Sequence, residues 1–177
     1  SSDLLSDIVL RSRDTLTARL AVMGTNASIN YPDTGNFIVE RYIPTGRKWR
    51  HLSVPTNTPQ SVNAAWQEGN TALANNSPGF GTIITDTSTD FASKGFDFRT
   101  PGGASMKYFN FATQNYVAIP NTNVANGLKR NTGYMIYVRG DRNSLPTNTT
   151  SNPTILRSAG PLFTGSQIIS VADTGFL

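Results

Sequence analysis

The chain contains one histidine, His51, so a triad of serine, histidine and acid would have to use it. A metal site built from several histidines is excluded, and the absence of cysteine excludes disulfides, thiolate metal sites and cysteine nucleophiles. No Gly-x-Ser-x-Gly elbow and no glycine-rich phosphate loop accompanies His51. We therefore expect a packed or surface histidine and no catalytic residues.

Three aspartates, Asp86, Asp90 and Asp97, lie in a region rich in loop-forming residues. Two of them facing each other would suit a glycosidase pair, and oxygen ligands on irregular loops would suit structural calcium. Their spacing matches no EF-hand, and aspartate is common in turns because its side chain bonds nearby backbone. We interpret them as turn residues, with a calcium site as the alternative and no other cofactor.

Exposed aromatic rings are a means of binding sugars, so Trp49, Trp66, Tyr108 and Tyr116 are the rings to consider. Trp66 lies on the apolar face of an expected helix, and Trp49 on the apolar face of an expected strand. Both are predicted to be core residues. Tyr108 and Tyr116 therefore remain the main ligand-binding candidates, with Trp49 behind them.

The tripeptide Arg139-Gly140-Asp141 is recognised by some animal adhesion receptors, but here it ends the strongest predicted strand. We interpret the match as coincidence. We expect Gly140 to permit a bend, and Asp141 to pair with a neighbouring arginine and close the sheet.

Composition favours one loop-rich β domain over residues 1–177. Charged residues make up only 15% of the 177, whereas the aromatic residues are spread along the whole chain, so nearly every segment has something large to bury. The net charge of +4 is dispersed, which predicts solubility and no nucleic-acid partner. No apolar run is long enough for a membrane-spanning helix.

Alternating apolar residues predict most of the elements as strands. Residues 16–22 should bury one face, 36–43 and 47–54 could pair as a hairpin, 105–111 and 116–119 should form another, and 133–139 should be central. Shorter strands are expected at 81–85, 154–157 and 166–171. Together they predict a mainly β fold, a jelly-roll-like β-sandwich.

One short helix is predicted near 59–68. Thr58 would be its N-cap, Pro59 would occupy its first turn and Gly69 would end it. Residues 143–153 are all turn formers, which indicates a long loop or a boundary. The apolar ending 175–177 suggests a fragment of a longer polypeptide.

The order and spacing of several segments resemble those of large surface proteins of Bacteroidota. The matching segments are 35–44, 47–55, 65–69, 78–81, 95–97, 108–117 and 133–142. The resemblance implies a non-catalytic structural or adhesive module of a secreted protein, at the cell surface or outside the cell. Such proteins are usually exported by the type IX system, whose sorting domain is not recognisable here.

The same resemblance bears on partners and modification. It implies contacts with other domains of the polypeptide, and with surface glycans or the secretion machinery. Asp14-Thr15-Leu16 is similar to the O-glycosylation motif of these bacteria, which makes Thr15 a candidate, although an ordinary turn explains it equally well. The alternatives are a carbohydrate-binding module of an exoenzyme, then a glycoside hydrolase fragment or a cargo of the secretion system.

Overall fold

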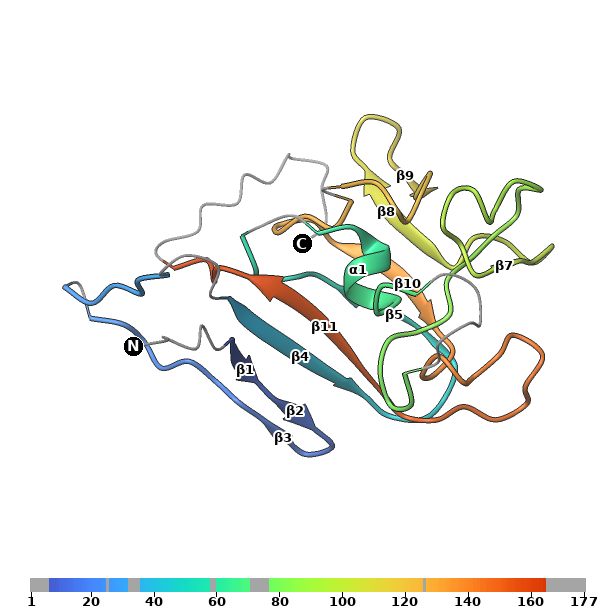
Figure 1. Cartoon of the computed structure of the whole chain (residues 1–177). Coiled ribbons are helices and arrows are strands. Elements are labelled where there is room, and N and C mark those ends of the chain that lie inside the picture. The colour runs from blue at the N-terminus through green and yellow to red at the C-terminus, as the bar shows by residue number, and fades with distance from the viewer. Residues whose placement is uncertain are drawn as a thin grey trace.

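The computed structural model describes residues 7–24, 26–31, 36–57, 60–70, 77–125 and 127–164. The fold is mainly β with one short helix, as predicted. Two sheets carry most of the strands, and two small strand pairs lie beside them. Figure 1 shows how these elements are arranged.

The first sheet has the order β1-β4-β11, formed by β1 (Ile8–Leu10), β4 (Phe37–Ile43) and β11 (Thr154–Gly160). The three strands lie side by side in Figure 1, in dark blue, teal and red. β1 runs parallel to β4, whereas β11 pairs antiparallel with β4 along its whole length. The free edge of β11 is partly covered, because Gly79 and Gly81 exchange backbone hydrogen bonds with Ile155.

The second sheet has the order β5-β10-β8-β9 and is antiparallel throughout. Its strands are β5 (Lys48–Leu52), β10 (Tyr134–Val138), β8 (Met106–Asn110) and β9 (Asn115–Ala118). The predicted hairpin of β8 and β9 is present, and β10 lies between β5 and β8, as its apolar run indicated. The remaining strands are the β2 (Ser12–Arg13) and β3 (Leu16–Thr17) hairpin and the parallel pair β6 (Thr85–Asp86) and β7 (Phe98–Arg99).

The helix α1 (Val62–Trp66) is shorter than the sequence predicts. Ser61 is its N-cap, because the Ser61 hydroxyl accepts a hydrogen bond from the backbone N–H of Ala64 at 3.0 Å. Thr58 and Pro59 lie outside the described residues. Trp66 is buried as predicted and meets the ring of Tyr134 edge-on at 6.0 Å, so the helix packs onto the second sheet as well as contacting β11.

Both larger sheets and α1 contribute to one apolar core. Its members come from β4 and β11, from β8 and β10, and from the helix: examples are Ile43, Leu156, Met106, Ile136 and Trp66. The jelly-roll-like sandwich remains a prediction.

Three local predictions are wrong. Residues 16–22 do not form a buried strand: only Leu16–Thr17 is strand, Leu16 is 76% exposed and Val22 is fully exposed. The segments containing β4 and β5 do not pair, since each strand finds its partners in a different sheet. The segment 81–85 forms a strand only at Thr85–Asp86.

Residues 143–153 contain no helix or strand, in agreement with the predicted loop. The strand after this loop, β11, pairs with β4, so strands from both sides of it share a sheet. The strand predicted at 166–171 and the apolar ending lie outside the described residues.

Candidate functional site

Alternation along the four strands of the second sheet separates a buried face from an outer face. Tyr134, Ile136 and Val138 of β10 are buried, so the residues between them point to the opposite side. The strand register then assigns the neighbours of those residues to the same side. The outer face consists of Trp49, His51, Lys107, Phe109, Tyr116, Ala118, Met135 and Tyr137.

Aromatic rings form two groups on this outer face, which together are called the aromatic row. Trp49 packs on Tyr137 with ring centres 5.4 Å apart, and the ammonium group of Lys107 lies 5.5 Å from the Trp49 ring. Toward the opposite edge of the same face, the ring centre of Phe109 lies 5.3 Å from that of Tyr116 and 5.2 Å from that of Phe111. Both contacts are edge-on. One group therefore lies on β5 and β10, and the other on the β8–β9 hairpin.

A hydrogen bond joins the two edge strands across the outer face. Nε2 of His51 and the phenol oxygen of Tyr116 are 3.0 Å apart, although His51 lies on β5 and Tyr116 on β9, the two edge strands. The Tyr116 side chain must therefore lie over the outer face. This arrangement presents the face of a ring beside polar atoms, a combination that suits a sugar, which has both apolar C–H faces and hydroxyls.

The structure changes the expected burial of two of the three ligand-binding candidates. Trp49 is not a core residue: it is 45% exposed on the outer face. Tyr108 is not an exposed ring, because it pairs with Tyr134 on the buried side and packs against the core. Tyr116 is 44% exposed and lies on the outer face.

Sequence reasoning did not select the other members of the row: Phe109, Phe111 and Tyr137. The alternation within the β8–β9 hairpin was visible and places Phe109 and Phe111 on the same side of their segment. The pairing of Tyr137 with Trp49 depends on the register between β5 and β10, which are far apart in the chain. Only the tertiary structure supplies that register.

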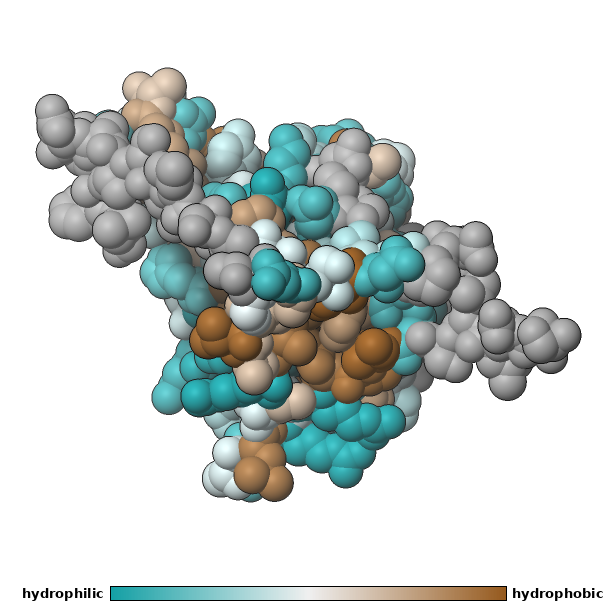
Figure 2. All heavy atoms as spheres, turned by 90° about the vertical axis from the view of Figure 1, so that its left-hand side faces the viewer, coloured by the Kyte–Doolittle hydropathy of each residue, from teal (hydrophilic) through white to brown (hydrophobic). Residues whose placement is uncertain are grey.

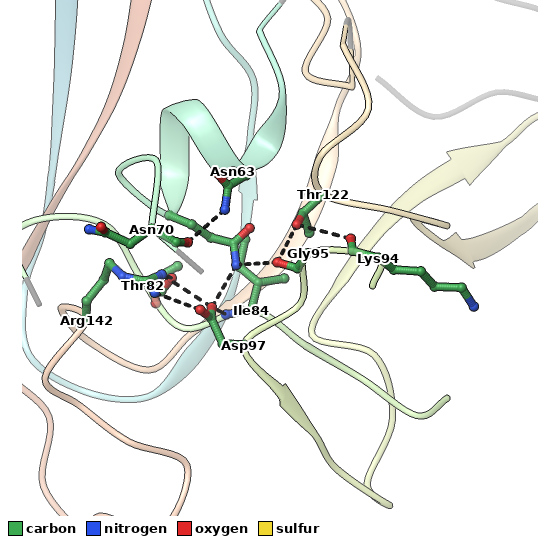
Figure 3. A network of polar contacts seen from close by, with 10 residues as sticks. Asn63, Asn70, Thr82, Ile84, Lys94, Gly95, Asp97, Thr122 and Arg142 are labelled. Carbon is green, nitrogen blue, oxygen red and sulfur yellow. Dashed lines mark hydrogen bonds and ion pairs between the residues drawn. The ribbon is translucent and has the colours of Figure 1, made fainter. Parts of the chain in front are cut away.

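Asp97 is enclosed in a polar network rather than facing a second acid (Figure 3). Its carboxylate pairs with the guanidinium of Arg142, with Nη2 and Oδ1 2.7 Å apart, and both side chains are fully buried. Oδ2 also accepts hydrogen bonds from Nε2 of Gln67 and the backbone N–H of Ile84, each at 2.8 Å. Both Asp97 oxygens are therefore occupied by protein donors.

Asp86 and Asp90 make local contacts of the kind predicted for turn residues. The Asp86 carboxylate accepts hydrogen bonds from the hydroxyl and the backbone N–H of Ser88. Asp90 pairs with Lys94 at 3.0 Å on the surface. Burial raises the pKa of Asp86, but the bonds from Ser88 and the backbone N–H of Thr87, together with the charge of Lys94, outweigh it and lower that pKa overall.

A metal ion prefers several oxygen or nitrogen ligands converging on one point. Within the described ranges, no three His, Asp or Glu side chains are grouped so as to hold an ion.

Asp141 does not pair with an arginine, contrary to the prediction. It accepts hydrogen bonds from the backbone N–H groups of Gly79 and Asn143, and from the side chains of Ser144 and Asn152. The arginine next to it, Arg142, pairs with Asp97 instead. Asp141 is 2% exposed and Arg139 is also buried, so the tripeptide is not presented as a receptor ligand would be.

Gly140 makes the predicted bend at the end of β10. Its φ of +116° is strained for any residue with a side chain. A Cβ there would also lie 2.4 Å from Oγ of Ser144 and 2.7 Å from the carbonyl oxygen of Asn152.

The glycosylation candidate Thr15 lies in the turn of the β2–β3 hairpin. Thr15 is exposed, and the turn is tight, with Asp14 at a φ of +31°. Its hydroxyl is thus on the surface, at a place where both a modified and an unmodified threonine would fit.

A cavity of about 380 Å³ opens between the two larger sheets. Its lining includes Glu40 and Arg41 of β4, His51 of β5, and Ser53 and Ser158. The hydrogen bond of His51 goes to Tyr116, and among the described residues none joins His51 to a serine or a carboxylate. Glu40 accepts from the backbone N–H of Ser12. The cavity thus brings polar groups together without the hydrogen bonds of a triad.

A second exposed apolar region consists of aliphatic side chains near the N-terminal end. Figure 2 looks at the left-hand side of Figure 1, where β1 and the β2–β3 hairpin lie, and shows apolar surface gathered between polar atoms. Among the described residues up to position 22, the exposed aliphatic side chains are those of Ile8, Val9, Leu16, Leu20 and Val22. These side chains have no polar atoms to orient a polar ligand.

Comparisons with protein-family models, curated proteins and solved structures gave no match. In the part of the chain that the structure describes, no helix combines the length and the apolar character needed to cross a membrane.

Proposed function

We propose that the chain is a non-catalytic, adhesive module that binds a glycan on the outer face of its second sheet. The single observation that supports this most is the aromatic row on one exposed face, with Trp49, Tyr116 and Phe111 between 44% and 61% exposed. Leaving such rings exposed to water is unfavourable, whereas a sugar ring stacked on them would remove apolar surface from solvent. The resemblance to bacterial surface proteins supports an extracellular location for this role.

The polar atoms on the face favour a sugar over another apolar protein surface. The His51–Tyr116 hydrogen bond and the ammonium of Lys107 lie among the rings, so a purely apolar partner would have to bury them. A glycan offers hydroxyls to these groups. A structural role, in which another domain of the same polypeptide covers the face, is the competing function.

The test is binding of the purified chain to a glycan array and to insoluble polysaccharides, followed by titration of the best ligand. We expect Trp49→Ala and Tyr116→Ala each to weaken binding by about tenfold, because each removes a stacking ring worth on the order of 1 kcal/mol or more. Thermal unfolding of both variants should stay close to that of the wild type, since these rings are exposed.

Two control variants separate the face from the rest of the molecule. Leu16→Ala removes an exposed apolar side chain on the β2–β3 hairpin. Tyr108→Phe removes only the hydroxyl group of a ring on the buried side of β8. Both should bind like the wild type. Retention of no glycan would overturn the proposal in favour of the structural role, and equal binding by all four variants would place the ligand elsewhere.

A further inference from the structure

Two arginines lie together at one end of the outer face. In the β5–β10 register Tyr137 pairs with Trp49 and Val138 with Lys48, and continuing it by one residue sets Arg139 opposite Arg47. Because side chains alternate, both arginines emerge on the same side as the two rings. The guanidinium of Arg139 lies 5.0 Å from the Tyr137 ring, which joins the arginine pair to the aromatic row.

Among the described residues, neither arginine has a carboxylate partner. Arg139 donates from Nη2 to the hydroxyl of Thr85 at 3.3 Å, and Arg47 donates to the carbonyl oxygens of Leu145 and Pro146 at 2.6 and 3.1 Å. The ion pairs found among the described residues are Lys94–Asp90, Arg142–Asp97 and Arg157–Glu68. Two cations on neighbouring strands without a counter-charge repel each other, so an anion bound there would be stabilised.

Two hydrogen-bond donors without an acceptor belong to these same arginines. Nη1 of Arg139 and Nε of Arg47 are buried and have no hydrogen-bond partner in the part of the chain that the structure describes. Arg139 as a residue is 91% buried. A buried N–H without an acceptor costs roughly 1–3 kcal/mol, and more when charged, so an acceptor from a ligand would recover that energy.

Burial lowers the pKa of Arg139, and the positive charge of Arg47 adds to this lowering against the opposite effect of Tyr137. The repulsion between the two guanidinium groups is thus felt at Arg139. A negative charge between them would relieve both effects.

The rest of the outer face carries positive charge and no acid. Lys107 lies over the Trp49 ring, and none of the eight outward positions of the four strands is Asp or Glu. A neutral ligand would leave these cations without a partner. An anionic one would meet the positive charge of Lys107 as well as that of the two arginines.

We propose that the glycan bound by this face is acidic, with a carboxylate or sulfate group held between Arg139 and Arg47 and its sugar rings on the aromatic row. The guanidinium fork matches the paired oxygens of either group. This inference rests on the proposed function, and it names the class of glycan that the face would select.

The test compares oligosaccharides of equal length by isothermal titration calorimetry at low and high salt. The probes are a neutral cello-oligosaccharide, a galacturonate oligomer carrying carboxylates and a heparin fragment carrying sulfates. We expect an acidic probe to bind about tenfold tighter than the neutral one in 50 mM salt, an advantage that shrinks as salt rises. The better of the two acidic probes identifies the anionic group.

Arg139→Met should reduce the ratio of acidic to neutral affinity to near one. The matched control is Arg13→Met, which removes the same charge from the exposed β2–β3 hairpin and should keep the ratio. An unchanged ratio in Arg139→Met, or equal affinities in the wild type, would overturn this inference while leaving glycan binding intact.

Two further outcomes concern the proposed function. If no oligosaccharide binds, glycan binding itself fails. Tight binding of single-stranded oligo(dT) that depends on Arg139, without glycan binding, would also overturn both proposals, because aromatic rings beside arginines can stack bases.

Discussion

Arg139 and Arg142 are three residues apart at the end of β10, and their surroundings are opposite. Arg142 is fully buried and paired with Asp97 in the network of Figure 3. Arg139 lies over an aromatic ring next to a second arginine and has no carboxylate partner among the described residues. In that same part of the chain, each arginine has one buried nitrogen without an acceptor, so the presence or absence of an acid is what distinguishes them. We expect the arginine with an acid to stabilise the fold and the one without to be available to a ligand.

The largest expected effect comes from removing the paired arginine. Arg142→Met leaves the Asp97 carboxylate buried without its cation, and we expect it to lower the free energy of unfolding by about 3–5 kcal/mol. Urea denaturation measures this. Adding Asp97→Asn to Arg142→Met should restore part of the loss, because the uncompensated charge is then gone. A loss below about 1 kcal/mol for Arg142→Met would mean that the pair contributes little to the fold.

The glycine between the two arginines should come next. Gly140→Ala forces a side chain into a positive φ and against Ser144 and Asn152, so we expect a loss of roughly 1–3 kcal/mol. Gly102→Ala is the control, because a Cβ there would meet nothing within 4 Å. Similar unfolding midpoints for the two variants would show that the bend at Gly140 is not under constraint.

The unpaired arginine should tolerate the same substitution that Arg142 does not. Arg139→Met loses the contact with Tyr137 and the hydrogen bond to Thr85, but it also removes an unused buried donor and the repulsion from Arg47. These effects oppose each other, and we expect a change in unfolding free energy within about 1 kcal/mol. A loss as large as that of Arg142→Met would contradict the contrast between the two arginines.

The smallest effect concerns an acid that is held by hydrogen bonds instead of a buried cation. The pKa of Asp86 is lower in the folded chain than in the unfolded one, so its stabilising contribution is complete above about pH 4. That contribution is lost as the pH falls through the folded-state pKa. Between pH 5 and pH 2, the urea midpoint of Asp86→Asn should fall less than that of the wild type. Parallel curves would show that the bonds from Ser88 do not favour the ionised form.

Local sequence patterns were enough to predict several strands, one hairpin and the apolar face of the helix. The strands β4 and β10, the β8–β9 hairpin and the apolar face of α1 were predicted because alternation and helical spacing are properties of neighbouring residues. Residues 16–22 show the limit of this reasoning. They alternate, yet Leu16 and Val22 are exposed, because a strand buries a face only where another layer covers it.

The candidate site could be predicted only in part. Tyr116 was selected correctly as an exposed ring, but Trp49 was assigned to the core because it alternates with charged residues. Arg50 pairs with the fully buried Ile136, so the side of β5 that carries Arg50 faces inward. Trp49 lies on the other side of the strand and faces outward. Local alternation gives the two sides of a strand, but not which one meets the core.

The sequence by itself determined that this chain is mainly β, that most of its strands lie where alternation places them, and that a cysteine site and a cluster of histidines are excluded. The tertiary structure alone decided which rings form the row and that Arg47 and Arg139 are neighbours. It also decided that the carboxylate of Asp97 pairs with the guanidinium of Arg142. The physical reason is that strand register and burial join residues far apart in the chain, and no local pattern records those distances.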